Sequence, residues 1–161
     1  MPDDGPANET VEFRPCHPDQ EPARSLIAAM VGELRELYGI GDGGRLGVAL
    51  EPAELAPPGG VYLVGWQDGR PVAGGGLRTI GAGMGEIKRM YVVPGQRGRG
   101  TARLLLGALE GRARALGMTA VRLDTGHRQP HARHLYETSG YAAVENYNGN
   151  GHAAFWGEKA L

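Results

Sequence analysis

Apolar residues recur every three or four positions in three stretches of the chain, a spacing typical of amphipathic helices. These stretches span residues 19–39, 101–117 and 130–140. In the first, the apolar stripe consists of Leu26, Ile27, Met30, Val31, Leu34, Leu37 and Tyr38. Pro130 suits the first position of the third helix, and Gly140 is a suitable stop. Because Pro52–Leu55 is long enough for one more helical turn, we expect about four helices.

Shorter runs, rich in β-branched and aromatic residues or alternating in polarity, predict strands. The predicted strands are Thr10–Arg14, Val61–Gln67, Arg70–Ile80, Glu86–Val93, Val121–Asp124, Tyr141–Val144 and Ala153–Lys159. Asp68-Gly69 predicts a two-residue hairpin turn between the second and third of them. The order of elements predicts an α/β (α+β) fold, with a mixed, largely antiparallel sheet of about six or seven strands flanked by about four helices.

Length and composition indicate one domain with a single core. We assign residues 10–161 to it, and residues 1–9, which have prolines and acids but no periodicity, to a disordered tail. Glycine, at 28 of 161 residues, is more than twice as frequent as its usual ~7% and predicts several mobile loops. There is no membrane-spanning apolar run or signal peptide, and Cys16 is the single cysteine. We therefore expect a cytoplasmic protein without a membrane partner.

Charge is distributed unevenly, although the formal net charge is only −1, which argues against nucleic-acid binding. Residues 1–60 contain eleven acidic side chains and four arginines. Residues 86–114 contain seven basic side chains and two acidic ones. The basic segment suits a polyphosphate such as coenzyme A. The acidic segment suits a cationic amine, or it is an ordinary solvated surface.

The stretch from Glu86 to Glu110 combines a predicted strand, a glycine-rich turn and a helix. Pro94 ends the strand, residues 95–100 contain three glycines and two arginines, and Thr101 begins the helix. Free backbone N–H groups and the positive end of a helix dipole meet in such a turn, so the stretch predicts an anion site suited to phosphate. A P-loop needs lysine where Thr101 stands, and a dinucleotide fingerprint needs glycine where Arg103 stands. A nucleotide-binding domain is kept as an alternative.

Two blocks of the sequence resemble the GNAT superfamily of N-acetyltransferases. Arg97–Ala102 reads R-x-x-G-x-A directly after a predicted strand, and is similar to the family's main motif R/Q-x-x-G-x-G/A. Gln129–Tyr141, QPHARHLYETSGY, is similar to the family's later block N-x-x-A-x-x-L-Y-E-x-x-G-F/Y. The likeness extends loosely from Val11 to Lys159, and the order of elements agrees with it. It implies that acetyl-CoA is the co-substrate.

The resemblance also implies which residues contact the coenzyme. The loop residues that would surround its diphosphate are Arg97, Gly98, Arg99, Gly100, Thr101 and Ala102. Tyr91, Val92 and Val93 would offer main-chain groups to the pantetheine arm, with the Val92 amide donating to the thioester oxygen. Gln129 stands where the family often has asparagine, and would bond the pantetheine or cap the following helix.

Glu86 is the candidate general base, because some GNAT enzymes carry a glutamate at the same offset, six residues before Val92. The alternative is an exposed glutamate at a strand end, paired with Lys88 or Arg78. Asp124, at the end of the next predicted strand, is the second candidate for the base.

Tyr136 is the candidate general acid. It lies in Leu135-Tyr136-Glu137, which matches the family's tyrosine beside the coenzyme sulfur. A phenol with a pKa of ~10 can protonate a departing thiolate. The alternative is a core tyrosine on an amphipathic helix.

The resulting hypothesis is an N-acetyltransferase in which a small-molecule or peptide amine attacks acetyl-CoA directly in a ternary complex. No nucleophile elbow is present for a covalent intermediate. The alternatives are transfer of another acyl group, or a non-catalytic regulator that binds acyl-CoA. The resemblance suggests a homodimer, and the three histidines of residues 127–134 predict surface positions and no metal site. Residues that could line the acceptor pocket are Glu33, Glu36, Trp66, Tyr147 and Trp156.

Overall fold

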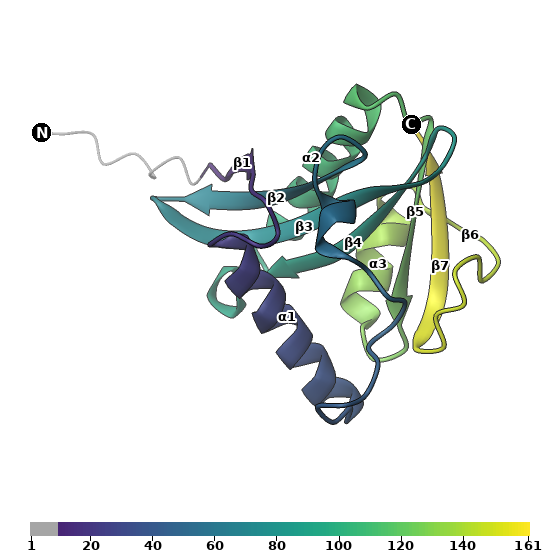
Figure 1. Ribbon diagram of the computed structural model, residues 1–161, viewed down its shortest axis with the longest axis horizontal. Coiled ribbons are helices and arrows are strands. Elements are labelled where there is room, and N and C mark those ends of the chain that lie inside the picture. The colour runs from purple at the N-terminus through teal and green to yellow at the C-terminus, as the bar shows by residue number, and fades with distance from the viewer. Residues whose placement is uncertain (1–9) are drawn as a thin grey trace, which may run out of the picture.

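A computed structural model describes residues 10–161, so the tail predicted over residues 1–9 lies outside the described residues. Seven strands of this range form one sheet, flanked by three α-helices (Figure 1). The strands are β1 (Glu12–Pro15), β2 (Gly60–Gln67), β3 (Arg70–Gly81), β4 (Met84–Val92), β5 (Ala120–Gly126), β6 (Ala142–Ala143) and β7 (Ala153–Ala160). The α-helices are α1 (Ala23–Tyr38), α2 (Thr101–Ala115) and α3 (Pro130–Thr138), and two 3-10 turns are η1 (Pro52–Leu55) and η2 (Pro94–Gln96).

The expected number of helices, about four, is wrong, because the described range contains three α-helices. The predicted extra turn forms only the 3-10 turn η1, which Glu51 and Glu54 cap reciprocally. Ala56 is extended and two prolines follow it, so the turn cannot lengthen. All seven predicted strands and the Asp68-Gly69 hairpin are confirmed, although β6 is only two residues long. No helix within residues 10–161 is long and apolar enough to cross a membrane.

Helices cover both faces of the sheet (Figure 1). In β2, Tyr62 and Val64 belong to a buried cluster with side chains of α1 and η1. Val61 and Leu63, which alternate with them, belong to a larger buried cluster with side chains of α2, α3 and β5. This follows from the two-residue period of a strand, which directs successive side chains to opposite faces.

Several glycines lie in the buried sheet and not in loops. Gly74, Gly75 and Gly76 occupy the middle of β3, and a Cβ at Gly76 would lie 2.7 Å from Leu55 Cδ1. At Gly74 it would overlap the Tyr62 hydroxyl. The bare strand therefore lets two large side chains lie directly on it. These three glycines lie within the strand that the sequence predicts over Arg70–Ile80.

The sheet has the order β1-β2-β3-β4-β5-β7-β6, and only β4 and β5 are parallel. These two strands pair over just three residues of each, ending at Glu86 opposite Arg122. Beyond this point β4 continues to Val92 and β5 to Gly126 without pairing with each other, and the two strands diverge (Figure 1). The largely antiparallel sheet predicted from the sequence is confirmed, and its one parallel junction is open at one end.

Gly60 tests how tightly η1 is held against the sheet. A Cβ at Gly60 would overlap the Glu54 carbonyl oxygen and lie 2.6 Å from that of Leu77, both backbone atoms that cannot move independently. We expect Gly60→Ala to lower the free energy of unfolding by about 1–3 kcal/mol. The neighbouring Gly59→Ala is the control, because its Cβ would meet only Thr79 Oγ1 at 3.7 Å. Chemical denaturation measures both, and equal stability of the two variants would contradict this packing.

Candidate functional site

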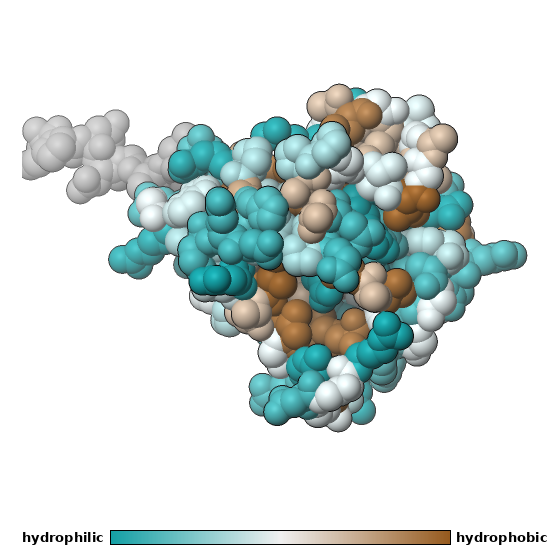
Figure 2. Space-filling view, viewed as in Figure 1, coloured by the Kyte–Doolittle hydropathy of each residue, from teal (hydrophilic) through white to brown (hydrophobic). Residues whose placement is uncertain are grey.

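A pocket of about 130 Å³ opens where β4 and β5 separate. The two strands contribute Ile87–Met90 and Asp124–Gly126 to its walls. An apolar wall comes from α1 and the loop before η1, through Met30, Leu34, Leu46, Val48 and Leu50. Figure 2 shows apolar surface gathered on this face, with polar surface around it. Asn150 and His152, between β6 and β7, add polar groups. One side of the pocket therefore suits an apolar group and the other a polar or charged one.

The loop between β4 and α2 presents free backbone donors. The amides of Gly98, Gly100, Thr101 and Ala102 have no acceptor within residues 10–161. Gly98 and Gly100 have φ of +79° and +80°, a conformation that favours glycine. Gln96 braces the loop by donating to the buried Thr101 Oγ1 at 3.2 Å. The N-terminus of α2 can therefore receive an anion, as the sequence predicts for residues 97–102.

The Arg97 side chain uses its donors within the protein. Its guanidinium forms a two-pronged pair with Glu33 of α1 at 2.8 Å, and its Nε donates to the Val92 carbonyl at 2.9 Å. The bond from Arg97 lowers the pKa of the Glu33 carboxyl. The Arg97 amide donates to Pro94 O at 3.3 Å. Arg97 therefore fixes the loop to α1 and β4, whereas Arg99 is exposed in the same loop.

Of the three residues predicted to offer main-chain groups to the pantetheine arm, one directs its amide into the gap between β4 and β5. The Val93 amide donates to Val72 O of β3 at 3.0 Å. Successive residues of a strand direct their backbone groups to opposite edges, so Val92 turns its amide toward β5 and Tyr91 turns back toward its partner Gly74. Only Val92 of the predicted three thus faces the open side.

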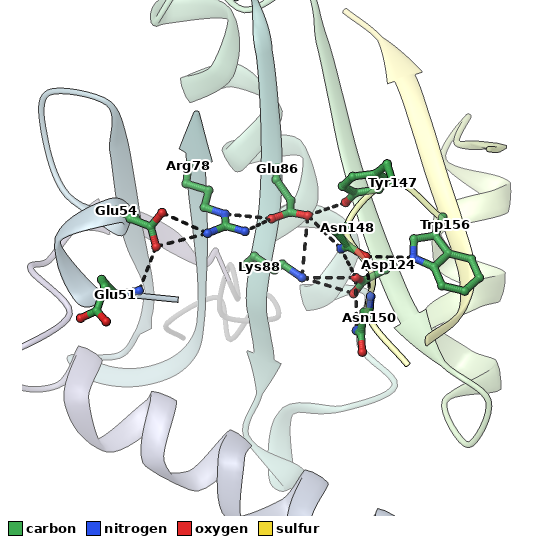
Figure 3. A network of polar contacts seen from close by, with 10 residues as sticks. All are labelled: Glu51, Glu54, Arg78, Glu86, Lys88, Asp124, Tyr147, Asn148, Asn150 and Trp156. Carbon is green, nitrogen blue, oxygen red and sulfur yellow. Dashed lines mark hydrogen bonds and ion pairs between the residues drawn. The ribbon is translucent and has the colours of Figure 1, made fainter. Parts of the chain in front are cut away.

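Glu86 is completely buried at the point where β4 and β5 separate, so the alternative is wrong about its exposure, but the predicted pairing with Arg78 or Lys88 is confirmed. Arg78 donates to its Oε1 at 2.8 Å and also binds Glu54 of η1 at 3.1 Å (Figure 3). Its other oxygen accepts from the Tyr147 hydroxyl at 2.5 Å and from Asn148 at 3.2 Å. Burial and the Glu86 charge raise the pKa of Tyr147. Every polar edge of this carboxylate is therefore occupied.

Asp124 lies on the pocket side of the same network (Figure 3). Lys88 Nζ lies 3.3 Å from Asp124 Oδ2 and 3.8 Å from Glu86 Oε2, so one ammonium lies between two carboxylates. The side-chain amides of Asn148 and Asn150 also donate to Asp124 Oδ2. Unlike Glu86, Asp124 lines the pocket, so it is the carboxylate that a bound molecule can reach directly.

Tyr136 of α3 lines the pocket from the other face of the sheet. It is 7% exposed, and its hydroxyl donates to Met90 Sδ at 3.8 Å. Burial, and then the charge of Asp124, raise the pKa of the phenol above its ordinary value. The hydroxyl is therefore neutral at physiological pH and keeps a proton to donate. Its place is compatible with both sequence interpretations, since it is part of the core and also reaches the pocket.

Gln129 joins the two sides of the pocket. Its Oε1 accepts from Gly126 N and from the Tyr38 hydroxyl, both at 3.2 Å. The Arg128 amide also donates to Tyr38 Oη, at 3.3 Å. Gln129 makes no side-chain bond that caps α3, so that part of the expectation is wrong. Gln129 lines the pocket, and its Nε2 makes no hydrogen bond within residues 10–161.

None of the five residues suggested from the sequence for the acceptor pocket lines it. Glu33 instead binds Arg97, and Trp156 donates to Asn148 Oδ1 at 3.1 Å. The lining residues Tyr38 and Leu34 were visible as part of the apolar stripe of α1, but nothing in the sequence separated them from the core. Within the described chain no group of three or more His, Cys, Asp or Glu could hold a metal ion.

Comparisons with known proteins agree with this geometry. The acetyltransferase (GNAT) family matches residues 16–141. An IAA acetyltransferase from Azospirillum brasilense is 32% identical over 124 residues, which are 76% of this chain and 81% of that protein.

Solved structures share the fold. One assigned as an acyl-CoA N-acyltransferase from Klebsiella pneumoniae has a TM-score of 0.75 and 27% identity, covering 96% of this chain and 99% of that one. The PaiA N-acetyltransferase from Thermoplasma acidophilum, solved in complex with coenzyme A, has a TM-score of 0.69 and 17% identity, covering 94% and 99%. From the match over residues 16–141 and the shared fold, this chain belongs to the acetyltransferase (GNAT) family.

Proposed function

We propose that this enzyme transfers the acetyl group of acetyl-CoA to an amine by direct attack within a ternary complex. One observation carries the proposal: the free amides that follow β4 and the pocket between β4 and β5 lie on the same open junction of the sheet. The first holds an anion and the second holds a small organic group beside a carboxylate. Membership of the family supports acetyl transfer as the reaction.

The coenzyme is assigned to the loop and the open junction. The amides of Gly98, Gly100, Thr101 and Ala102 would hold its diphosphate, while Arg97 keeps the loop in place and the positive charge of Arg99 lies in the same loop. The gap between the strands would receive the pantetheine arm, with the Val92 amide and Gln129 Nε2 as donors. The donor set fits the group, because a diphosphate needs several convergent N–H groups and a pantetheine needs main-chain partners.

The chemistry needs a proton acceptor and a proton donor on opposite sides of the thioester. A thioester supplies an electrophilic carbonyl carbon, whose oxygen gains charge as a C–N bond forms and the C–S bond breaks. In this proposal the Val92 amide donates to that oxygen. Tyr136 supplies a proton to the departing sulfur, since it lines the pocket and its phenol is protonated at physiological pH.

We assign direct proton removal from the amine to Asp124. Glu86, the base suggested by the sequence, lies behind it, fully buried, and does not line the pocket. In this proposal Glu86 acts through the shared contacts with Lys88 and Asn148, which hold the Asp124 carboxylate in place. Both carboxylates are thus needed, but only Asp124 meets the substrate.

Substitution of Gly100 tests the coenzyme loop. A valine at its φ of +80° strains the turn and moves the amides of the α2 N-terminus, so we expect Gly100→Val to weaken coenzyme A binding at least about tenfold. Gly69→Val is the matched control, because Gly69 also has a positive φ, of +72°, and open space around it, but lies in the β2–β3 hairpin. Titration calorimetry measures both variants. An equal loss of coenzyme A affinity in the two variants would contradict the assignment of the loop to the coenzyme site.

Two isosteric variants separate the roles of the carboxylates. We expect Asp124→Asn to lower kcat by about 10²- to 10⁴-fold, with acetyl-CoA affinity unchanged, because the direct base is lost. Glu86→Gln should lower kcat less but also lower the melting temperature, since it leaves the buried Arg78 short of a charge partner. Steady-state kinetics and thermal unfolding check both. A larger kcat loss in a folded Glu86→Gln protein would return the base role to Glu86.

Removal of one hydroxyl tests the general acid. We expect Tyr136→Phe to lower kcat by about 10²-fold while the KM for acetyl-CoA changes little, because the phenyl ring keeps the packing. Tyr141→Phe is the control, since its ring is also buried, 6.0 Å from that of Tyr136, but does not line the pocket. Coenzyme A release, followed by thiol detection, reports turnover. Full activity of Tyr136→Phe would leave Tyr136 as a core residue only.

A further inference from the structure

Arg89 lines the pocket as a cation without an acidic partner. It is half-buried, yet makes no hydrogen bond or ion pair with any residue of the described range 10–161. The lysine before it is different, because Lys88 lies between Asp124 and Glu86. Burial, and then the charge of Arg78, lower the pKa of the Arg89 guanidinium. An unpaired cation in such a place is unfavourable, so a bound anion would be stabilised there.

The backbone of β4 is distorted at this residue. Arg89 has φ of +62°, one of two non-glycine residues with positive φ in the described chain, and it lies in a bulge where β4 has an extra residue opposite Gly75 of β3. Regular alternation would direct Lys88 and Arg89 to opposite faces of the sheet. The bulge breaks this alternation: Arg89 lies beside residues of α1 and η1, whereas Ile87, two positions earlier, packs on the side of α2 and α3. A strained conformation that redirects one charged side chain into a cavity suggests a function for that side chain.

Arg89 also marks where the pocket continues. A second hollow of about 190 Å³, between the start of α1 and η1, shares Arg89 and Leu50 with the first. The charged groups lining it are otherwise engaged, since Arg24 binds Glu21 at 3.1 Å and Asp19 contacts His17 at 3.9 Å. Arg89 is thus the available charge where the two hollows meet.

We propose that the amine acceptor also carries a carboxylate, and that Arg89 binds this carboxylate and so determines acceptor specificity; this rests on the proposed acetyl transfer. The guanidinium matches a carboxylate with two parallel hydrogen bonds. Asp124 lines the same pocket as Arg89, and its negative charge favours a monoanion over a phosphate dianion. The apolar wall formed by Leu34, Leu46 and Val48 accepts an apolar side chain. The substrate class is therefore an amino acid with its amine directed to Asp124.

Matched acceptors test this. Each common α-amino acid is compared with its carboxamide, which has nearly the same shape, no negative charge and a more easily deprotonated amine. For the best acceptor we expect wild type to favour the free acid by about 10- to 100-fold in kcat/KM. In Arg89→Gln the preference should disappear through a raised KM for the acid, with the KM for acetyl-CoA and the activity toward the amide retained. Arg89→Lys should recover part of it.

Controls make each outcome decisive. Arg70→Gln removes an exposed arginine of the β2–β3 hairpin and should leave the preference unchanged. Calorimetry with the coenzyme A-loaded protein, titrated with the preferred acid, should show binding to wild type that Arg89→Gln loses.

Equal use of acids and amides, or a preference that survives Arg89→Gln, would overturn the role of Arg89 while acetyl transfer stands. A raised KM for acetyl-CoA alone would assign Arg89 to the coenzyme instead. If acetyl-CoA binds but no acceptor is acetylated or bound, the proposed function fails and takes this inference with it.

Discussion

The separation of β4 from β5 after Glu86 and Arg122 is the constraint on which the site depends. Beyond this point the facing edges of two strands carry backbone donors and acceptors that no neighbouring strand satisfies. Such groups need water or a ligand. On either side the ladders are complete, with β3 paired along β4 and β7 along β5. The sheet is thus paired throughout except between β4 and β5. The pocket, the free amides and both carboxylates lie along this unpaired stretch.

Several charged side chains of this protein form ion pairs that hold structural elements together. The acidic first third of the chain could have been read as attraction for a cationic substrate, but Glu33 and Glu54 bind Arg97 and Arg78. The basic segment is likewise partly neutralised, because Lys88 lies between two carboxylates. These pairs fasten α1, η1 and the glycine loop to β4. Arg89, at the site proposed for the acceptor carboxylate, has no such acidic partner within residues 10–161.

The sequence predicted features with a local cause. Helical spacing located α1, α2 and α3, Asp68-Gly69 located a hairpin, and the glycine motif located the loop at the start of α2. It could not locate the pocket walls, because these contacts are distant in sequence: Tyr38 and Gln129 are 91 residues apart, and Tyr147 and Glu86 are 61 apart. Burial of Glu86 likewise depends on a loop with no periodicity. The bulge at Arg89 has no signature in the residues around it.

The contact of Tyr38 with Gln129 and Arg128 has a mechanical consequence. With no ladder across the wide end of the junction, this small clasp is one of the few links there between the β1–β4 half and the β5–β7 half. Each of its hydrogen bonds is worth only about 1 kcal/mol. The two halves still share one buried core, which includes Leu77 and Ile87 on one side and Val121 and Phe155 on the other. The wide end of the junction is therefore spanned by a handful of side chains over a fixed core, and widening it there breaks few hydrogen bonds.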